Sequence, residues 1–187
     1  MGTDKALLPH PRGGSWLDHA IDLLSTTCGR VIVSGRQQPA AAPRNNAVAW
    51  LPDQHPQRGP AGGVATVLRY LTSPESQAFC PDTDAVLLIP LDMPTLQAAH
   101  LRRLQVAWEA APDRVFAASF DGHFAEPLLA IYPKRFADQL ETLANSSDRS
   151  LSRWLRQQQP QRISISPSEI PNLNTASQWE AFRRTRS

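Results

Sequence analysis

The stretch that decides the fold is Ala85-Val-Leu-Leu-Ile-Pro-Leu-Asp-Met-Pro94. Its first five residues, 85–89, are apolar without interruption, a run too short to span a membrane and too apolar for a half-exposed strand. Such a run predicts a strand buried on both faces, as in a parallel sheet covered by helices on each side. Pro90 and Pro94 bracket its end, because proline has no N–H to donate to a sheet ladder.

Asp92 places a carboxylate just beyond the end of this predicted strand. In open α/β sheets, ligands bind at the carboxyl ends of the strands, so Asp92 is a candidate for a metal–phosphate site. A second interpretation is that Asp92 caps a helix that begins near Thr95. The stretch by itself leaves both interpretations open.

The composition is that of a single globular domain spanning residues 1–187. The chain has 41% hydrophobic and 19% charged residues, and its net charge is +2. This charge is too small to favour binding to nucleic acid or to a membrane surface. Cys28 and Cys80 are the only cysteines and lack the spacing of a zinc site. With no leader-like or membrane-length apolar run, these features predict a cytoplasmic protein.

The first third of the chain predicts a helix and two strands. Apolar residues recur at helical spacing over 16–28, between a capping Ser15 and a terminating Gly29. The β-branched stretch 30–34 and the apolar stretch 47–51 predict two short strands. We expect these two strands to lie parallel to each other.

A polar, glycine-rich loop over residues 52–63 leads into a predicted helix whose apolar face begins at Val64. Such a loop can bring backbone N–H groups to an anion at a helix N-terminus. Its glycine spacing matches neither the dinucleotide-binding pattern nor the P-loop. The alternative is a tight turn in which glycine lets two backbone segments approach closely.

The remainder of the chain completes an α/β pattern. We predict a helix over 101–111, an antiparallel hairpin formed by strands 114–119 and 128–132, and an edge strand over 162–166. Helices are predicted near 133–144 and 150–157, and a last helix follows Thr175. No internal repeat or interdomain linker interrupts this pattern.

Six short motifs occur along the chain in a specific order. They are Met1-Gly-x-Asp-Lys5, Asp53, Gly59-Pro-x-Gly62, Pro90-x-Asp92-x-Pro94, Glu126-Pro127 and Asn172-x-Asn174-Thr175. Together they resemble the molybdenum cofactor guanylyltransferases, the molybdopterin-guanine dinucleotide biosynthesis protein A family. This resemblance covers nearly the whole chain. It implies a Rossmann-like, three-layer α/β/α nucleotidyltransferase fold, with a mostly parallel sheet and an antiparallel hairpin.

The resemblance also implies a reaction and its partners. The family transfers GMP from GTP to molybdenum-molybdopterin, which yields the guanine dinucleotide cofactor and pyrophosphate, and the cofactor implied for the enzyme is Mg²⁺. The expected partners are GTP and molybdopterin, together with other proteins of cofactor biosynthesis or molybdoenzyme maturation. Neither nucleic acid nor a membrane is among them.

Roles are carried over residue by residue. Lys5 is expected to neutralise the GTP phosphates and Asp92 to hold Mg²⁺, and these two are the expected catalytic residues. Four further residues are expected to contact the nucleotide, namely Ser34, Asp53, Gly59 and Gly62. Two are expected to contact the pterin substrate, namely Asn172 and Asn174. These residue types suit the chemistry, because nucleotidyl transfer requires alignment and charge neutralisation. One carboxylate is sufficient for a magnesium ion that also binds phosphate oxygens and water.

The chain departs from the family at its start. The family opens with a buried strand and a Leu-Ala-Gly-Gly loop that ends in Ser-x-Arg-Met-Gly, and Met1 matches the methionine of that motif. The resemblance therefore implies an N-terminally truncated domain that lacks the first parallel strand and the main phosphate-binding and base-binding loop. Either the natural start lies upstream, which is our expectation, or the chain is a degenerate relative with weak activity.

Two other functions remain open from the sequence. One is a cytidylyltransferase or uridylyltransferase of the same fold, which a comparison of GTP with CTP would distinguish. The other is a non-catalytic protein that binds molybdopterin but has lost the nucleotide loop.

Overall fold

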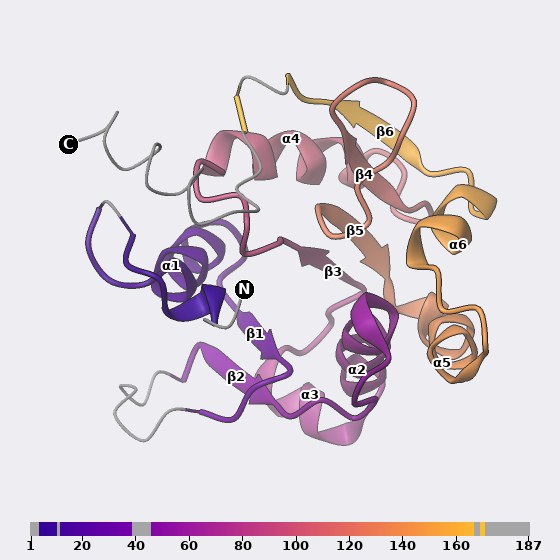
Figure 1. The fold of residues 1–187 in the computed structure, drawn as a ribbon. Helices are drawn as coiled ribbons and strands as arrows, with labels where there is room; N and C mark the ends of the chain where they lie inside the picture. The colour runs from indigo at the N-terminus through magenta and orange to yellow at the C-terminus, as the bar shows by residue number, and fades with distance from the viewer. Residues whose placement is uncertain (1–3, 11, 39–45, 167–168, 171–187) are drawn as a thin grey trace.

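The computed structural model describes residues 4–10, 12–38, 46–166 and 169–170. Helices and strands are interspersed along the chain (Figure 1). In chain order they are η1 (Lys5–Leu7), α1 (Trp16–Cys28), β1 (Val31–Ser34), β2 (Val48–Leu51), α2 (Gly59–Leu71), α3 (Pro74–Phe79), β3 (Ala85–Leu88), α4 (Ala98–Glu109), β4 (Phe116–Ser119), β5 (Ala130–Pro133), η2 (Lys134–Phe136), α5 (Ala137–Asn145), α6 (Leu151–Gln157) and β6 (Gln161–Ser164).

Helix α1 begins and ends where its sequence predicts. The Ser15 hydroxyl accepts from the backbone N–H of Asp18 at 3.1 Å, and the Asp18 carboxylate accepts from the N–H of Ser15 at 2.8 Å. This reciprocal capping box satisfies two N–H groups that the helix cannot bond internally. Gly29 ends the helix with a φ of 73°, a left-handed conformation that glycine adopts without steric cost.

The strands form two separate sheets. β1 pairs with β2 in parallel, with Val31 opposite Val48, which confirms the prediction for these two strands. The second sheet has the order β3-β5-β4-β6. In it β5 runs antiparallel to both of its neighbours, and β6 runs parallel to β4. The predicted hairpin is therefore β4–β5, and the predicted edge strand is β6.

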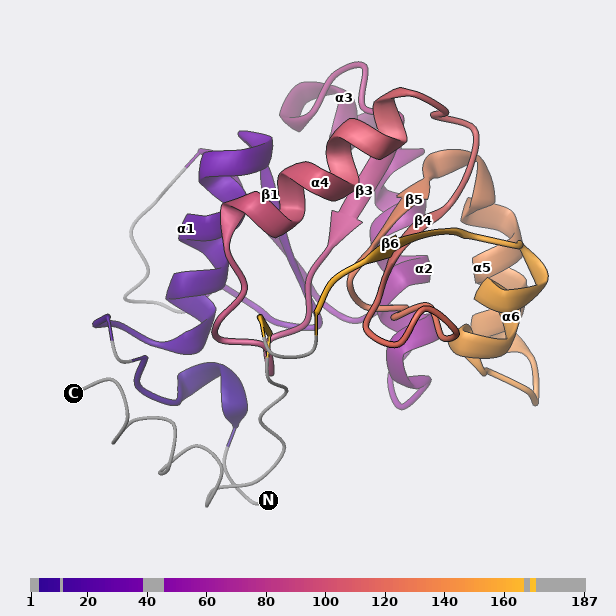
Figure 2. The same cartoon turned by 90° about the horizontal axis from the view of Figure 1, so that it is seen from above.

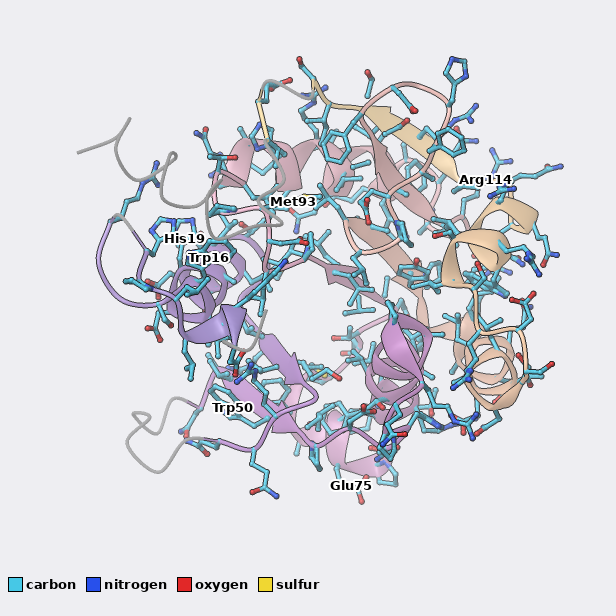
Figure 3. All side chains as sticks on the ribbon, in the orientation of Figure 1. Trp16, His19, Trp50, Glu75, Met93 and Arg114 are labelled. Atoms are coloured by element: carbon cyan, nitrogen blue, oxygen red, sulfur yellow. The ribbon has the colours of Figure 1, made fainter. Side chains whose placement is uncertain are left out.

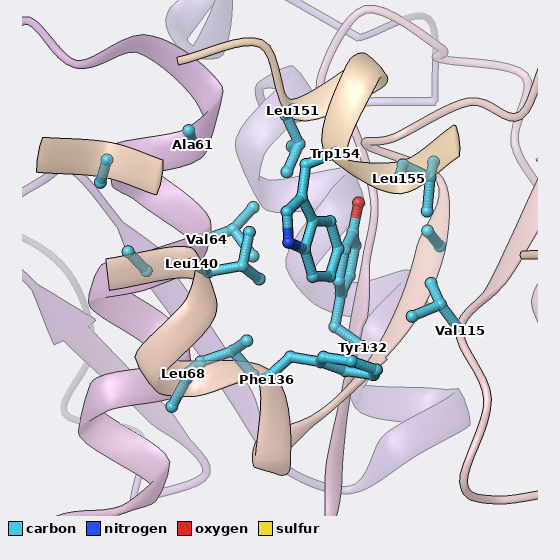
Figure 4. Close-up of a cluster of buried hydrophobic side chains, with 14 of the residues drawn as sticks. Ala61, Val64, Leu68, Val115, Tyr132, Phe136, Leu140, Leu151, Trp154 and Leu155 are labelled. Atoms are coloured by element: carbon cyan, nitrogen blue, oxygen red, sulfur yellow. The ribbon is translucent and has the colours of Figure 1, made fainter. Parts of the chain in front are cut away.

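Helices cover both faces of the strands, which gives the three layers expected from the sequence. α1 and α4 lie on one face, and α2, α5 and α6 lie on the other (Figure 2). On the second face, the Trp154 ring packs edge-on against Phe136, with 5.4 Å between ring centroids, and is stacked near Tyr132 at 6.0 Å (Figure 4). Leu68 of α2 and Leu140 of α5 are fully buried in the same cluster.

The prediction that 85–89 is buried on both faces is wrong. Every residue of β3 is partly exposed, whereas all residues of β4 and β5 are buried. The reason is that β3 pairs with β5 along one edge only. Its other edge faces β1 across an open groove in which the described residues place no strand.

Two other interpretations of the sequence are also corrected. Residues 59–63 do not belong to the loop, because α2 already begins at Gly59; Pro60 is tolerated there since the first turn needs no N–H bond from it. Asp92 does not cap the next helix. α4 begins at Ala98, and its capping box is formed by Gln97 and His100.

Within the described residues, no helix is long and apolar enough to cross a membrane. Both cysteines are free thiols, Cys28 at the surface and Cys80 buried.

Candidate active site at the carboxyl ends of the strands

Lys5 and Asp92 meet although 86 residues separate them in the sequence numbering. The Lys5 ammonium lies 3.8 Å from the Asp92 carboxylate, and the two side chains are 33% and 28% exposed. Lys5 belongs to the short η1 helix, and Asp92 follows β3. Both charges can therefore reach solvent or a ligand while being held by ordered backbone. The structure thus brings together the pair that was predicted to be catalytic.

Packing holds η1 at this position. Ala6 is buried against Leu17 and Val33, and Leu91 packs against the same cluster. The Asp4 side chain accepts from the N–H of Ala6 at 3.1 Å and so caps the short helix. The backbone on each side of the Lys5–Asp92 pair is therefore fixed by apolar contacts with α1 and β1.

Arg36 adds a second cation, which the sequence analysis did not identify. It follows β1, and its guanidinium donates to both carboxylate oxygens of Asp4. These hydrogen bonds are the main cause of a lowered pKa for the Asp4 carboxyl. Arginine is suited to binding phosphate, because its planar group can donate two parallel hydrogen bonds. The carboxyl ends of β1 and β3 thus each supply one charged residue to the neighbourhood of η1.

Glu126 provides a second carboxylate close to Asp92. Burial raises the pKa of the Glu126 carboxyl, and the negative charge of Asp92 raises it further. One oxygen of Glu126 accepts from the N–H of Leu128 at 3.2 Å. The Glu126-Pro127 motif was part of the family resemblance, but no role was predicted for Glu126. That motif was the available signal, since the sequence alone does not show that residue 126 approaches residue 92.

These side chains suit a magnesium ion that is shared with phosphate. Magnesium prefers hard oxygen ligands and is usually held by one or two carboxylates together with phosphate oxygens and water. Asp92 and Glu126 offer such oxygens on partly exposed side chains. In the part of the chain that the structure describes, no cluster of three or more His, Cys, Asp or Glu side chains could hold a metal ion by itself.

Ser34 and the glycines of α2 lie next to one another. The Ser34 hydroxyl donates to the backbone carbonyl of Gly63 at 3.4 Å, which links the end of β1 to the first turns of α2. At Gly62 a Cβ atom would lie 2.9 Å from the Cβ of His55. Gly62 therefore allows the close backbone approach that the sequence left open as an alternative. Gly59 has a φ of 63°, which explains the need for glycine at the start of the helix.

Asp53 lies in the exposed loop before α2. Its carboxylate accepts from the N–H of His55 at 2.8 Å, and the His55 ring is in turn 3.1 Å from Glu141. No contact among the described residues joins Asp53 to the Lys5–Asp92 pair. The predicted pterin-binding residues Asn172 and Asn174 lie outside the described residues.

Two stacked histidines anchor the segment that follows Asp92. The ring of His10 lies 3.9 Å from that of His19, with a 10° angle between the ring planes. His10 Nε2 lies 3.2 Å from the carbonyl oxygen of Pro94. Burial lowers the pKa of both imidazoles, so the neutral rings are favoured in the folded protein. His10 thus contacts the chain just after Asp92, and Leu91 packs against η1 and α1 just before it.

An open groove of about 790 Å³ runs between β1 and β3 beside this site. Figure 3 shows the space with the described side chains drawn, bounded by β1, β3 and α2. Its walls are mainly apolar side chains of α1, α2 and the two strands, and Arg36 and Leu91 lie among its lining residues at the end nearest the charged pair.

Comparison with known protein sequences finds a matching family model and relatives that carry the same name. A family model described as the MobA-like NTP transferase domain matches residues 1–163. The chain is 36% identical to a probable molybdenum cofactor guanylyltransferase of Rhodopirellula baltica, over 94% of this chain and 82% of the relative. It is 30% identical to a molybdenum cofactor guanylyltransferase of Xanthomonas euvesicatoria, over 96% of this chain and 85% of the relative.

Solved structures share the fold. The molybdopterin-guanine dinucleotide biosynthesis protein A of Archaeoglobus fulgidus superposes with a TM-score of 0.69 at 19% identity, covering 98% of this chain and 91% of that one. The 2-C-methyl-D-erythritol 4-phosphate cytidylyltransferase of Thermus thermophilus superposes with a TM-score of 0.60 at 13% identity, covering 99% and 94%. At these identities the likeness supports the Rossmann-like α/β fold and nothing finer.

Proposed function

We propose that this chain, which belongs to the MobA-like NTP transferase family and is a nucleotidyltransferase, transfers GMP from GTP to molybdenum-molybdopterin. A phosphate oxygen of molybdopterin attacks the α-phosphorus of GTP. The bond between the α-phosphorus and the bridging oxygen breaks, and pyrophosphate leaves with the electron pair. The products are the guanine dinucleotide cofactor and pyrophosphate. The names of the two relatives support this reaction over other transfers, and the geometry at Asp92 suits nucleotidyl transfer in general.

The attacking phosphate is already anionic, so the protein needs no general base to activate it. The barrier arises from bringing two anions together, and it is lowered by alignment and by positive charge at the phosphates. Lys5 supplies such a charge and Arg36 a second one, next to η1. We assign both to the phosphates of GTP.

Asp92 would hold Mg²⁺, with Glu126 as a second carboxylate whose pKa the charge of Asp92 raises. When bound, the ion supplies positive charge to the phosphate oxygens as pyrophosphate departs. Asp92 also orients Lys5, whose ammonium lies 3.8 Å away, so loss of this carboxylate removes a partner from Lys5 in addition to the metal ligand.

The remaining assignments extend from this centre. We assign Ser34, Gly59 and Gly62 to the nucleotide, because the first turns of α2 lie beside the end of β1. Asp53 is assigned to the nucleotide on the family resemblance alone. We assign the pair Asn172 and Asn174 to the pterin, since amide side chains can both donate to and accept from its ring. Changing both asparagines to alanine should weaken molybdopterin binding and leave GTP binding unchanged. Equal molybdopterin affinity in the double variant would contradict this assignment.

The observation that carries the proposal is the meeting of Lys5 and Asp92 at the carboxyl ends of the strands, from segments far apart in the chain. A lysine beside a carboxylate at this edge of an α/β sheet is suited to a nucleotide with its metal ion. A protein that only binds molybdopterin would not require both charges there.

The reaction can be tested directly. Protein translated from its full natural reading frame is incubated with molybdenum-molybdopterin, Mg²⁺ and each of GTP, CTP, UTP and ATP in turn. We expect guanine dinucleotide cofactor, identified by mass, and one pyrophosphate per product. Faster product formation from CTP would identify a cytidylyltransferase instead. Binding of molybdopterin without turnover of any nucleotide would identify a binding protein.

A further inference from the structure

The loop that joins β4 to β5 presents a large apolar side chain to solvent. Phe124, in this loop, is 68% exposed. A single exposed apolar residue is ordinary on a protein surface, so its exposure alone does not indicate a ligand. Two further features distinguish Phe124. Its backbone is held by hydrogen bonds on both sides, and it lies at the edge of the candidate active site.

Hydrogen bonds fix the backbone around Phe124. One carboxylate oxygen of Asp121 accepts from the N–H groups of His123 and Phe124, each at 2.8 Å. The guanidinium of Arg162, on β6, donates to the carbonyl of His123 at 3.0 Å. After Phe124, the N–H of Glu126 donates to a carbonyl of β4 at 2.7 Å. A ligand that meets the Phe124 ring therefore does not bear the cost of ordering this loop.

The loop lies at the same end of the sheet as Asp92. β3 and β4 both run antiparallel to β5, so their carboxyl ends lie at one edge of the sheet. In Figure 2 the loop after β4 and the segment after β3 both lie toward the lower side of the molecule. Burial raises the pKa of the Glu126 carboxyl, and the charge of Asp92, which therefore lies nearby, raises it further. Phe124 precedes Glu126 by two residues, which span at most about 7 Å of chain, so a ligand bound at Asp92 can reach it.

Asp92 lies between this loop and the proposed nucleotide contacts. Ser34 ends β1, and its hydroxyl donates to the carbonyl of Gly63 in α2, on the β1 side of β3. Phe124 follows β4, which lies on the other side of β3, since the order of the second sheet is β3-β5-β4-β6. Phosphoryl transfer requires the attacking and leaving oxygens to lie on opposite sides of the phosphorus. We therefore expect the second substrate on the Phe124 side of Asp92.

We propose that Phe124 determines specificity for the acceptor: the pyrimidine ring of the pterin stacks on its phenyl ring while the acceptor phosphate lies at Asp92. This inference rests on the proposed function, because it takes the acceptor to be molybdopterin. A phenyl ring suits a flat heterocycle, since stacked aromatic rings attract each other beyond the effect of the apolar area that they cover. The pterin ring is separated from the reacting phosphate of molybdopterin, as Phe124 is separated from Asp92.

Steady-state kinetics of GMP transfer test the stacking, with protein translated from its full natural reading frame. Phe124→Leu keeps an apolar side chain but removes the flat ring. We expect its KM for molybdopterin to rise about tenfold, the scale of stacking between a heterocycle and an aromatic side chain, with kcat and the KM for GTP unchanged. Phe124→Tyr keeps the ring and should keep the wild-type KM. Val106→Ala is the matched control, because Val106 of α4 is also 68% exposed, and all its constants should be unchanged.

Asp121 gives a second test, because its carboxylate positions the backbone of Phe124. Asp121→Ala removes the two hydrogen bonds to the N–H groups of His123 and Phe124, so the KM for molybdopterin should rise while the KM for GTP does not. Asp121→Asn keeps a side-chain oxygen that accepts these bonds, and it should keep the wild-type KM. Equal rises in both variants would assign the effect to the charge of Asp121 and would contradict a role in positioning Phe124.

The outcomes separate this inference from the proposed function. If the wild-type protein forms no guanine dinucleotide cofactor, the proposed function is overturned and this inference with it. If the wild-type protein forms the product and Phe124→Leu has an unchanged KM for molybdopterin, the inference alone is overturned. A rise in the KM for GTP would also overturn it, because the ring would then belong to the guanine site. Equal rises in Phe124→Leu and Val106→Ala would show a general effect of surface substitution and would overturn it too.

Discussion

The two sheets differ in how completely their strands are buried, although both belong to the same α/β layer. In the four-stranded sheet every residue of β4 and β5 is buried, and α5 and α6 cover it with fully buried side chains such as Leu140. In the two-stranded sheet every residue of β2 is partly exposed, and the main buried cluster has only three members. We therefore expect a substitution in the core beneath β4 and β5 to cost more stability than one beside β1 and β2.

The charged site lies between these halves and takes residues from each. Lys5 and Arg36 come from the two-stranded half, whereas Asp92 and Glu126 come from segments that adjoin the four-stranded sheet. The geometry of the site thus depends on how the halves are held together. Helix α2 is one link, because it packs on α5 and also lines the groove. Substitutions at the charged site, within each half and in α2 should therefore have different effects on activity and stability.

The largest effect is expected for Asp92→Asn. The substitution keeps the shape of the side chain but removes the charge that we propose holds Mg²⁺, and it removes the ion-pair partner of Lys5. We expect GMP transfer to fall by at least about 10³-fold, the scale seen when a main electrostatic contact to the transition state is lost. Thermal unfolding should change little, because the side chain is partly exposed and surface ion pairs contribute little to stability.

Asp84→Asn is the matched control, since Asp84 lies just before β3 at the opposite end of the same strand. It forms an ion pair with Lys134 at 3.0 Å, far from Lys5. Transfer should be unchanged in this variant. Similar loss of activity in both variants would show that Asp92 acts through strand stability and not through the metal ion.

The next effect contrasts the two halves with one type of substitution. Leu140→Ala removes a fully buried side chain from the packed half, and it should lower the free energy of unfolding by about 2–5 kcal/mol. Leu24→Ala removes a partly buried side chain that lines the groove, so no enclosed cavity forms, and the expected loss is about 1 kcal/mol. Urea unfolding of both variants gives the comparison. Equal losses would show that the groove is filled in solution.

The fold could be predicted where its signals are local in the sequence, and not where burial depends on which strands become neighbours. Helix α1 was predicted correctly because its cap, apolar stripe and terminating glycine are local signals. The hairpin β4–β5 was also predicted, from two short strands joined by a turn. The burial of β3 was not, since an apolar run indicates how much burial a strand favours, and only the tertiary structure shows which neighbours it has.

The candidate site was predicted in part. Lys5 and Asp92 were identified from the resemblance, and the structure places them together. Arg36 was missed because an arginine after a strand carries no distinctive pattern. Glu126 was seen in a motif but given no role, because its proximity to Asp92 depends on how the β4–β5 hairpin lies beside β3. The glycines of α2 were assigned to a loop because glycine has a low helix propensity. In the structure they lie in the helix, since packing outweighs that propensity.

A moderate effect on stability is expected in α2, the helix that links the two halves. In Gly62→Ala the new Cβ would lie 2.9 Å from the Cβ atoms of both His55 and Arg58, so the loop before α2 must shift. We expect a loss of about 1–3 kcal/mol in the free energy of unfolding, as for other overpacked positions. The adjacent Gly63→Ala is the control, because its Cβ meets nothing within 4 Å. That variant should be stabilised by about 0.5–1 kcal/mol, since alanine favours a helix interior. Loss of stability in both variants would contradict the close-approach explanation.

The smallest expected effect is a loss of stability at acidic pH, and it is expected in the two-stranded half. The stacked pair His10 and His19 has lowered pKa values, chiefly through burial, with the Arg12 charge acting in the same direction and Asp22 opposing it at His19. Near pH 8 both rings are neutral in the folded and unfolded states, so the pair gives no pH dependence. As the pH falls through about 6.5, the unfolded chain takes up protons before the folded protein does, and stability decreases. The decrease ends once the folded rings are themselves protonated.

Hydrogen exchange can locate this decrease. Because the pair joins η1 and α1 to the segment after Asp92, amides of α1 should exchange faster at pH 5.5 than at pH 7.5, relative to amides of α5, after correction for intrinsic rates. The double variant His10→Gln, His19→Gln lacks the titrating rings, so the ratio of α1 to α5 exchange should no longer depend on pH in this range. Carboxylates that titrate elsewhere remain in the variant and cancel in the comparison. An unchanged pH dependence in the variant would assign the acid sensitivity to those carboxylates, and the two halves would then loosen together.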